Sequence, residues 1–151
     1  MVYFVKWFIF GAGLLVLMVL SAEDLRNRKI HAGFMVMMGI GLCVLQEFYL
    51  IISGRQDHIE MIHWCMGAAP GAVLLLLGKV TGGRIGIGDG MVVFGAGLMT
   101  GGILSFRIFI WSLMLIFIFS CVGLLTGKLR CHSCIPFVPF YTMAYIGGWI
   151  L

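Results

Sequence analysis

Long apolar runs separated by short polar stretches dominate the chain, at intervals that suit helices crossing a lipid bilayer. Each crossing needs about 20 mainly apolar residues, and in lipid a single short run satisfies its backbone hydrogen bonds only as a helix. We therefore predict an all-α membrane protein, a bundle of six transmembrane helices in one domain, residues 1–151. The predicted helices cover residues 2–20, 30–52, 61–77, 89–104, 108–125 and 135–151.

Glycine and proline positions refine this pattern. Pro70 lies inside the third run and predicts a kink there. Glycines four residues apart let helix backbones approach closely, so they predict tight helix contacts, with the glycine-rich fourth helix at the centre. The pairs are Gly67/Gly71, Gly78/Gly82, Gly82/Gly86, Gly86/Gly90, Gly97/Gly101 and Gly123/Gly127. The first run resembles a signal peptide, but it almost lacks a charged start and further runs follow directly, so we keep it as a helix.

Composition and charge agree with a membrane protein and predict its orientation. Of the 151 residues, 62% are hydrophobic and 11% are charged, so no sizeable soluble domain is expected; the bilayer is the expected partner and nucleic acid is not. Seven of the 10 basic residues fall in three alternate loops, which the preference of basic residues for the cytoplasm places inside, at the inner membrane. These residues are Arg26, Arg28, Lys29, Lys79, Arg84, Lys128 and Arg130.

Two aspartates fall on the predicted cytoplasmic boundary, Asp24 at the end of the first helix and Asp89 at the start of the fourth. Ionisable groups at membrane depth are costly, so they mark a functional site. If the two helices pack side by side, one carboxyl keeps a proton and the other stays charged, and together they can activate water against a peptide carbonyl. This chemistry needs no metal and no cofactor. The dipole of the fourth helix favours Asp89 as the more readily ionised partner.

Three short motifs in the predicted cytoplasmic loops add specificity to this hypothesis. Their residues are Asp24, Arg26 and Lys29; Gly86, Gly88, Asp89 and Gly90; and Pro136, Phe137 and Pro139. In this order they resemble the two aspartate motifs and the proline-phenylalanine motif of the type IV prepilin peptidases, which are GxGD intramembrane aspartic proteases. The resemblance extends over roughly residues 1–151.

The resemblance implies an aspartic endopeptidase that removes the basic leader peptide of prepilins and pilin-like secretion proteins at the cytoplasmic membrane face. Asp24 and Asp89 match the two catalytic aspartates. The additional cytoplasmic region that larger members use for N-methylation has no counterpart here, so the chain resembles the short, peptidase-only form. His31 stands where the family usually has proline, and Met91 where it often has lysine, so the substrate preference is left open.

Other interpretations of the same residues remain. Cys131 and Cys134 have the spacing of metal ligands and, with His31 and His132, would complete a set of four, but no second cysteine pair supports a metal site. A non-catalytic assembly factor or a small proton-coupled transporter would use the acidic residues as a proton relay. The oligomeric state, and whether the two aspartates meet without substrate, are not determined by the sequence.

Overall fold

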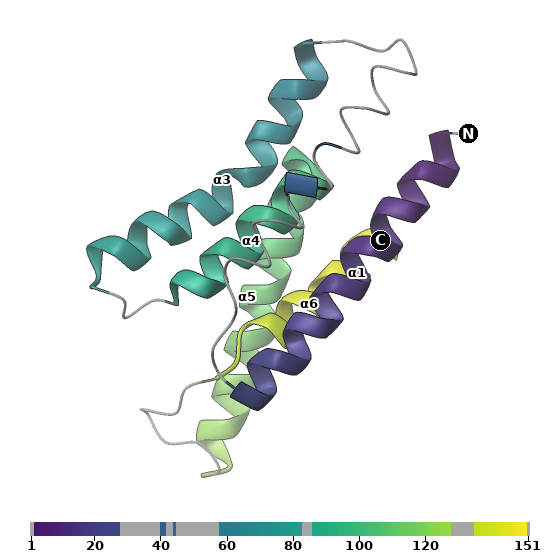
Figure 1. Cartoon of the computed structure of the whole chain (residues 1–151). Coiled ribbons are helices and arrows are strands. Elements are labelled where there is room, and N and C mark those ends of the chain that lie inside the picture. Colours follow the sequence, from purple (N-terminus) through teal and green to yellow (C-terminus); the bar gives the residue numbers. More distant parts are fainter. Residues whose placement is uncertain are drawn as a thin grey trace.

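The computed structural model describes residues 2–27, 40–41, 44, 58–82, 86–127 and 135–150. Within this part of the chain there are five helices and no strand, so the all-α prediction is confirmed. The helices are α1 (Val2–Asn27), α3 (His58–Val80), α4 (Ile87–Thr100), α5 (Gly102–Leu125) and α6 (Val138–Ile150). Helix α1 packs along α6, α3 along α4, and α5 contacts both pairs (Figure 1). The helix predicted over residues 30–52 lies, apart from residues 40, 41 and 44, outside the described residues.

The predicted bundle of six transmembrane helices is wrong. Two of the described helices are long and apolar enough to cross a membrane, over Trp7–Arg26 in α1 and Gly102–Leu125 in α5, which is compatible with a membrane location. Helix α4 has 14 residues and α6 has 13. At 1.5 Å per residue they measure about 20 Å, well short of the roughly 30 Å hydrocarbon layer. In α3 the apolar stretch Cys65–Val80 is shorter than a membrane span requires.

Gly101 explains why α4 is so short. This residue has a φ of 77°, which an L side chain rarely adopts, and it ends α4 after Thr100. Helix α5 then begins at once, at Gly102. Residues 102–104, predicted as the end of the fourth helix, and residues 105–107, predicted as a loop, therefore both belong to α5. One glycine therefore divides an almost continuous apolar stretch into a short helix and a long one.

The hydrophobic core lies where α1, α4 and α6 meet. Its buried residues are Val16, Leu17 and Leu20 of α1, Val92, Val93 and Ala96 of α4, Ile108 of α5, and Val138, Tyr141, Ala144 and Tyr145 of α6. Tyr141 and Tyr145 of α6 are the largest of its fully buried side chains in the described part of the chain. Because α1 supplies part of this core, it is an integral helix of the fold.

Helices α3 and α4 approach so closely that glycine is required on both. A Cβ on Gly67 would meet the carbonyl oxygen of Gly97, and a Cβ on Gly71 would meet the backbone nitrogen of Phe94. Ser105 of α5 closes the group with a 2.7 Å hydrogen bond from its hydroxyl to the carbonyl oxygen of Gly67. The predicted close contacts at these glycines are thus confirmed, and α3 changes direction in its middle, where Pro70 lies (Figure 1).

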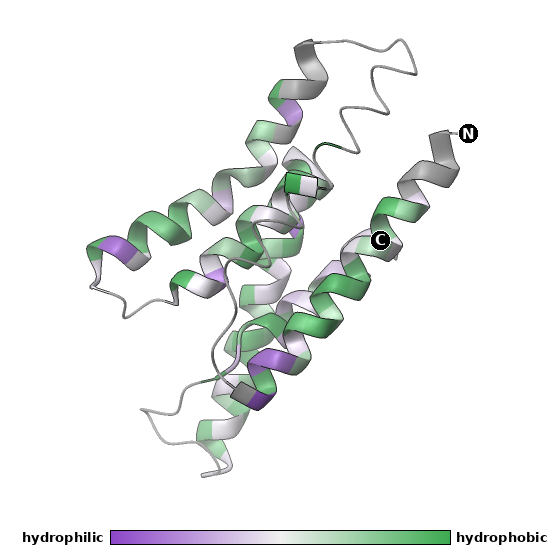
Figure 2. Cartoon of the chain, in the orientation of Figure 1, coloured by the Kyte–Doolittle hydropathy of each residue, from purple (hydrophilic) through white to green (hydrophobic). Residues whose placement is uncertain are grey.

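Helix α5 has small and polar residues inside and large apolar residues outside. Its buried residues are Gly102, Ser105, Ile108 and Ser112, whereas Ile110, Trp111, Phe117 and Leu125 are among its exposed ones. The core helix of a soluble protein would have the opposite arrangement. Along α1, hydrophobic residues continue until hydrophilic ones appear at the C-terminal end (Figure 2). These surfaces are suited to contact with lipid.

Candidate active site

Asp24 lies in the last turn of α1 and is buried, with 8% of its surface exposed. Its carboxylate oxygen Oδ2 accepts a hydrogen bond of 3.4 Å from the backbone N–H of Val138, the first residue of α6. The first N–H groups of a helix have no partner inside the helix and carry the positive end of its dipole. The N-terminus of α6 is therefore placed to hold the Asp24 carboxylate.

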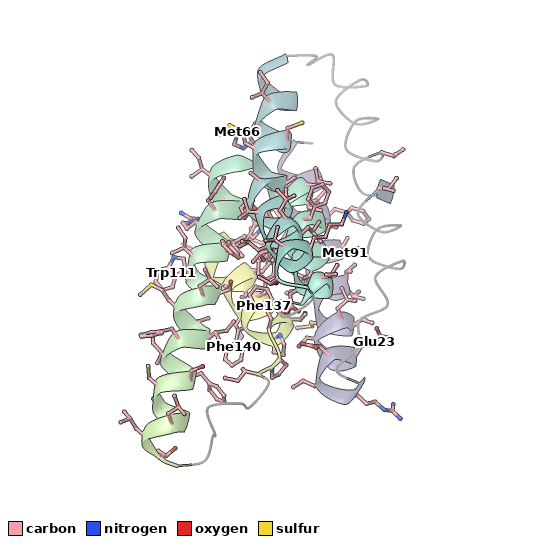
Figure 3. All side chains as sticks on the ribbon, turned by 90° about the vertical axis from the view of Figure 1, so that its left-hand side faces the viewer. Glu23, Met66, Met91, Trp111, Phe137 and Phe140 are labelled. Carbon is pink, nitrogen blue, oxygen red and sulfur yellow. The ribbon has the colours of Figure 1, made fainter. Side chains whose placement is uncertain are left out.

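The proline-phenylalanine motif positions this N–H group. Pro136 precedes α6 and Pro139 lies in its first turn, where the missing N–H of proline costs no helical hydrogen bond. Between them, Val138 keeps its N–H. The ring of Phe137 stacks on the ring of Tyr141, with the centroids 5.8 Å apart. Phe137 and Phe140 both lie at the start of α6, between α5 and α1 (Figure 3). The sequence indicated this motif only by resemblance; its contact with Asp24 links residues 114 positions apart.

Asp89 is the third residue of α4 and is half-buried. It lies outside both helices that could cross a membrane. Burial, and secondly the negative charge of Asp24, raise the pKa of Asp89 to about 6. The two carboxyl groups are therefore close enough to interact, as the aspartate-pair hypothesis requires. No hydrogen bond joins them directly in the described part of the chain.

The raised pKa of Asp89 runs against the effect expected from the helix dipole. Asp89 does lie in the first turn of α4, where the dipole favours an anion. Desolvation and the charge of Asp24 act in the opposite direction and are the larger effects, because together they raise the pKa by about two units. Burial therefore favours the protonated form of Asp89.

The glycines around Asp89 shape its surroundings. Gly86 is the N-cap of α4, and a Cβ built on it would lie 2.6 Å from Oδ2 of Asp89. Gly90 is buried, and its Cβ would lie 3.0 Å from the backbone nitrogen of Leu75 in α3. Gly88 is half-buried in the same turn, and nothing in the structure assigns it a separate role. Gly86 therefore leaves room for the Asp89 carboxyl, and Gly90 lets α4 approach α3.

Alanine at Gly86 is expected to displace the Asp89 carboxyl without unfolding the protein. The atom that the new methyl group meets is the end of a flexible side chain, so the free energy of unfolding should change by less than about 1 kcal/mol. A misplacement of this size should lower a catalytic rate that depends on Asp89 by about 100-fold. Thermal unfolding and the rate of peptide cleavage measure the two effects. A large loss of folding stability alongside the loss of rate would contradict this role of Gly86.

The stability of the protein is expected to depend on pH through Asp89. Because its folded-state pKa is raised above the unfolded value, burial of Asp89 costs nothing below about pH 4, and the folded state loses stability as pH rises through 6. Asp89→Asn removes this loss, which amounts to about 1–3 kcal/mol at 1.36 kcal/mol per unit after allowance for partial exposure. Melting curves should show the variant as more stable than wild type at about pH 8 and equal to it at about pH 4. A constant difference would exclude the raised pKa.

The remaining predicted site residues are only partly placed. Arg26 is exposed at the C-terminal end of α1, where its charge complements the helix dipole. Met91 is half-buried on α4, two residues after Asp89. Lys29, His31, Cys131 and Cys134 lie outside the described residues. Among the described residues no three histidine, cysteine or acidic side chains come together as metal ligands do.

Comparisons with known proteins identify no relative of this chain. No protein-family model, no curated protein and no solved structure matches the chain. The function of the site therefore has to be argued from Asp24, Asp89 and the start of α6.

Proposed function

We propose that this protein is a membrane aspartic endopeptidase that removes the leader peptide from prepilins or pilin-like precursors. The observation that carries the proposal is the meeting of three sequence-remote elements: Asp24 accepts a hydrogen bond from Val138 in the proline-phenylalanine motif, and its charge acts on Asp89. Two interacting carboxyl groups with different proton affinities are the machinery of aspartic proteolysis. The three motifs that resemble those of the prepilin peptidases supply the substrate class.

The chemistry uses one charged and one protonated carboxyl group. Asp24 accepts a proton from water while the water oxygen bonds to the carbonyl carbon of the substrate, and Asp89 donates its proton to the carbonyl oxygen. The resulting gem-diol collapses when Asp24 passes its proton to the departing nitrogen and Asp89 takes one back from a hydroxyl group. The C–N bond breaks, and both carboxyl groups return to their starting states. No cofactor takes part.

The proposal includes an inner-membrane location and a multi-pass topology, with at least α1 and α5 across the bilayer. The exposed apolar side chains of α5 then face lipid, and the basic residues near the aspartates face the cytoplasm. Phe140 of α6 packs on Phe119 of α5, with the ring centroids 5.1 Å apart. Phe119 lies six residues (125 minus 119), or about 9 Å, before the end of α5. Asp24, bonded to the same turn of α6, lies at a similar depth. The peptide bond of the substrate therefore has to reach the depth of Asp24, which lies on the bilayer side of the cytoplasmic end of α5.

The pH dependence of cleavage should report the proton on Asp89. Because Asp89 acts as the acid, kcat/KM is expected to fall as pH rises through about 6 in the substrate-free enzyme. Rates measured between about pH 5 and about pH 8 on a prepilin reconstituted in nanodiscs test this. A rate that instead rises through about pH 6 would show that Asp89 works as the base, and the roles of the two aspartates would be exchanged.

The experiment that tests the proposed function is cleavage of a prepilin in membranes. The protein and a prepilin are co-expressed in cells that lack a prepilin peptidase, and the product is examined for the size shift and sequenced from its new N-terminus. We expect one cut, just before the hydrophobic helix, that is absent without the protein. An intact prepilin in membranes that contain the folded protein would favour the non-catalytic assembly factor or the proton-coupled transporter.

A further inference from the structure

Helix α6 carries three buried polar atoms that lack a hydrogen-bond partner in the described part of the chain: the hydroxyls of Tyr141 and Tyr145 and the indole N–H of Trp149. These residues are four positions apart, so they lie one above another on one face of the helix. The two hydroxyls are close enough to interact electrostatically, and the Trp149 N–H faces the Tyr145 hydroxyl without reaching hydrogen-bond geometry. The three atoms form one continuous polar file.

The helices opposite this file are apolar. The Tyr145 hydroxyl lies over Gly13 of α1, where a Cβ would be only 2.6 Å away, and the sulfur of Met99 in α4 would lie 3.5 Å from the same Cβ. The ring of Phe10 stacks on Tyr145 at 5.5 Å and packs against Trp149 at 5.0 Å. None of these described neighbours offers a strong hydrogen-bond donor or acceptor side chain.

The energetics require partners for these groups. An unsatisfied buried polar group costs roughly 1–3 kcal/mol, and folded proteins leave only a few of them per hundred residues. Three on one 13-residue helix would therefore consume much of the stability of a typical domain. A tyrosine hydroxyl both donates and accepts, whereas an indole N–H only donates, so the complementary ligand has to do both. Water does this, and it is the usual partner of buried polar groups.

The polar file begins one helical turn from the residue that holds Asp24. Tyr141 lies one helical turn beyond Val138, whose N–H holds Asp24. From Tyr141 the file runs eight residues along α6 to Trp149, or about 12 Å. We propose that Tyr141, Tyr145 and Trp149 hold a chain of internal water molecules between α1, α4 and α6, and that its end beside Asp24 supplies the water for hydrolysis. The second half of this proposal rests on the proposed peptidase function.

The sign of a stability change tests for the water chain. Tyr145→Phe removes only a hydroxyl group; if that group binds water, the melting temperature should fall by roughly 2–4 °C in nanodiscs. If it has no partner, its removal should leave the melting temperature unchanged or raise it, and the proposal would be overturned. Tyr141→Phe should behave alike, and the double variant should lose less than the sum because the hydroxyls share one chain.

X-ray radiolytic labelling of the full-length protein in nanodiscs provides the direct measurement, because bound water becomes reactive where it lies. We expect Tyr141 and Tyr145 to be labelled several-fold faster than Phe137, a neighbouring aromatic residue without a polar atom. Equal labelling would exclude the water. In an active enzyme, Tyr141→Phe should lower kcat several-fold and leave KM unchanged. Labelled tyrosines in a protein that never cleaves a prepilin would retain the water chain and reject the peptidase; cleavage without labelling would reject the water chain alone.

Discussion

Asp24→Asn is expected to abolish cleavage of a prepilin, with a loss of about 10²- to 10⁴-fold in kcat, the range typical of a positioned acid or base. Asparagine has the same shape and can still accept the hydrogen bond from Val138, so α1 and α6 should stay in place. It cannot accept a proton from water. Asp89→Asn should cause a similar loss because the carbonyl oxygen then receives no proton. Cleavage by purified variants in nanodiscs, with full-length prepilin, measures both effects.

A second measurement shows whether such losses come from the aspartate pair. In Asp24→Asn the negative charge that helps to raise the pKa of Asp89 is gone, while burial remains. The pKa of Asp89 should therefore fall below about 6 without returning to its ordinary value, which infrared difference spectra of the carboxyl group would detect. Full activity in either single variant would rule out the pair as the catalytic group. An unchanged pKa of Asp89 would mean that the two carboxyl groups do not interact.

Gly97→Ala is expected to be strongly destabilising at the α3–α4 contact. The new Cβ would overlap the backbone carbonyl of Gly67 and would lie 2.9 Å from the Ser105 hydroxyl, which bonds that same carbonyl. Backbone atoms of a packed helix cannot move aside as a side chain can. We expect a net loss of about 2–3 kcal/mol, even though alanine gains about 1 kcal/mol in helix propensity. Thermal and denaturant unfolding in mild detergent measure this loss.

Gly95→Ala is the matched control, two residues earlier in α4. A Cβ at Gly95 meets no atom within 4 Å in the described part of the chain. The variant should therefore be as stable as wild type or more stable by up to about 1 kcal/mol, through helix propensity alone. Comparable destabilisation of both variants would indicate that α4 tolerates no alanine at all, and that the close approach of α3 is not the cause.

Some properties of the aspartate pair could be predicted from the sequence and others could not. Asp24 and Asp89 stood out because carboxyl groups are rare in apolar runs, and their motifs placed both on one face. Burial raises the pKa of Asp89, against the effect expected from the helix dipole, because the dipole is a local property whereas burial depends on side chains from other helices. The Val138 N–H was missed for the same reason: every residue but proline has one, and only folding brings this one to Asp24.

The sequence by itself determined that the protein is helical and apolar, that glycines mark close backbone contacts, and where the two acidic residues lie along the chain. These properties depend on residue type and on spacing over one or two helical turns, which any part of the chain carries with it. The tertiary structure decided that Gly101 adopts a positive φ and shortens α4, that among the described helices two have the length to span a bilayer, and that α6 meets Asp24 with its first N–H. Each of these depends on packing between segments far apart in the chain, and no local pattern of residues encodes it.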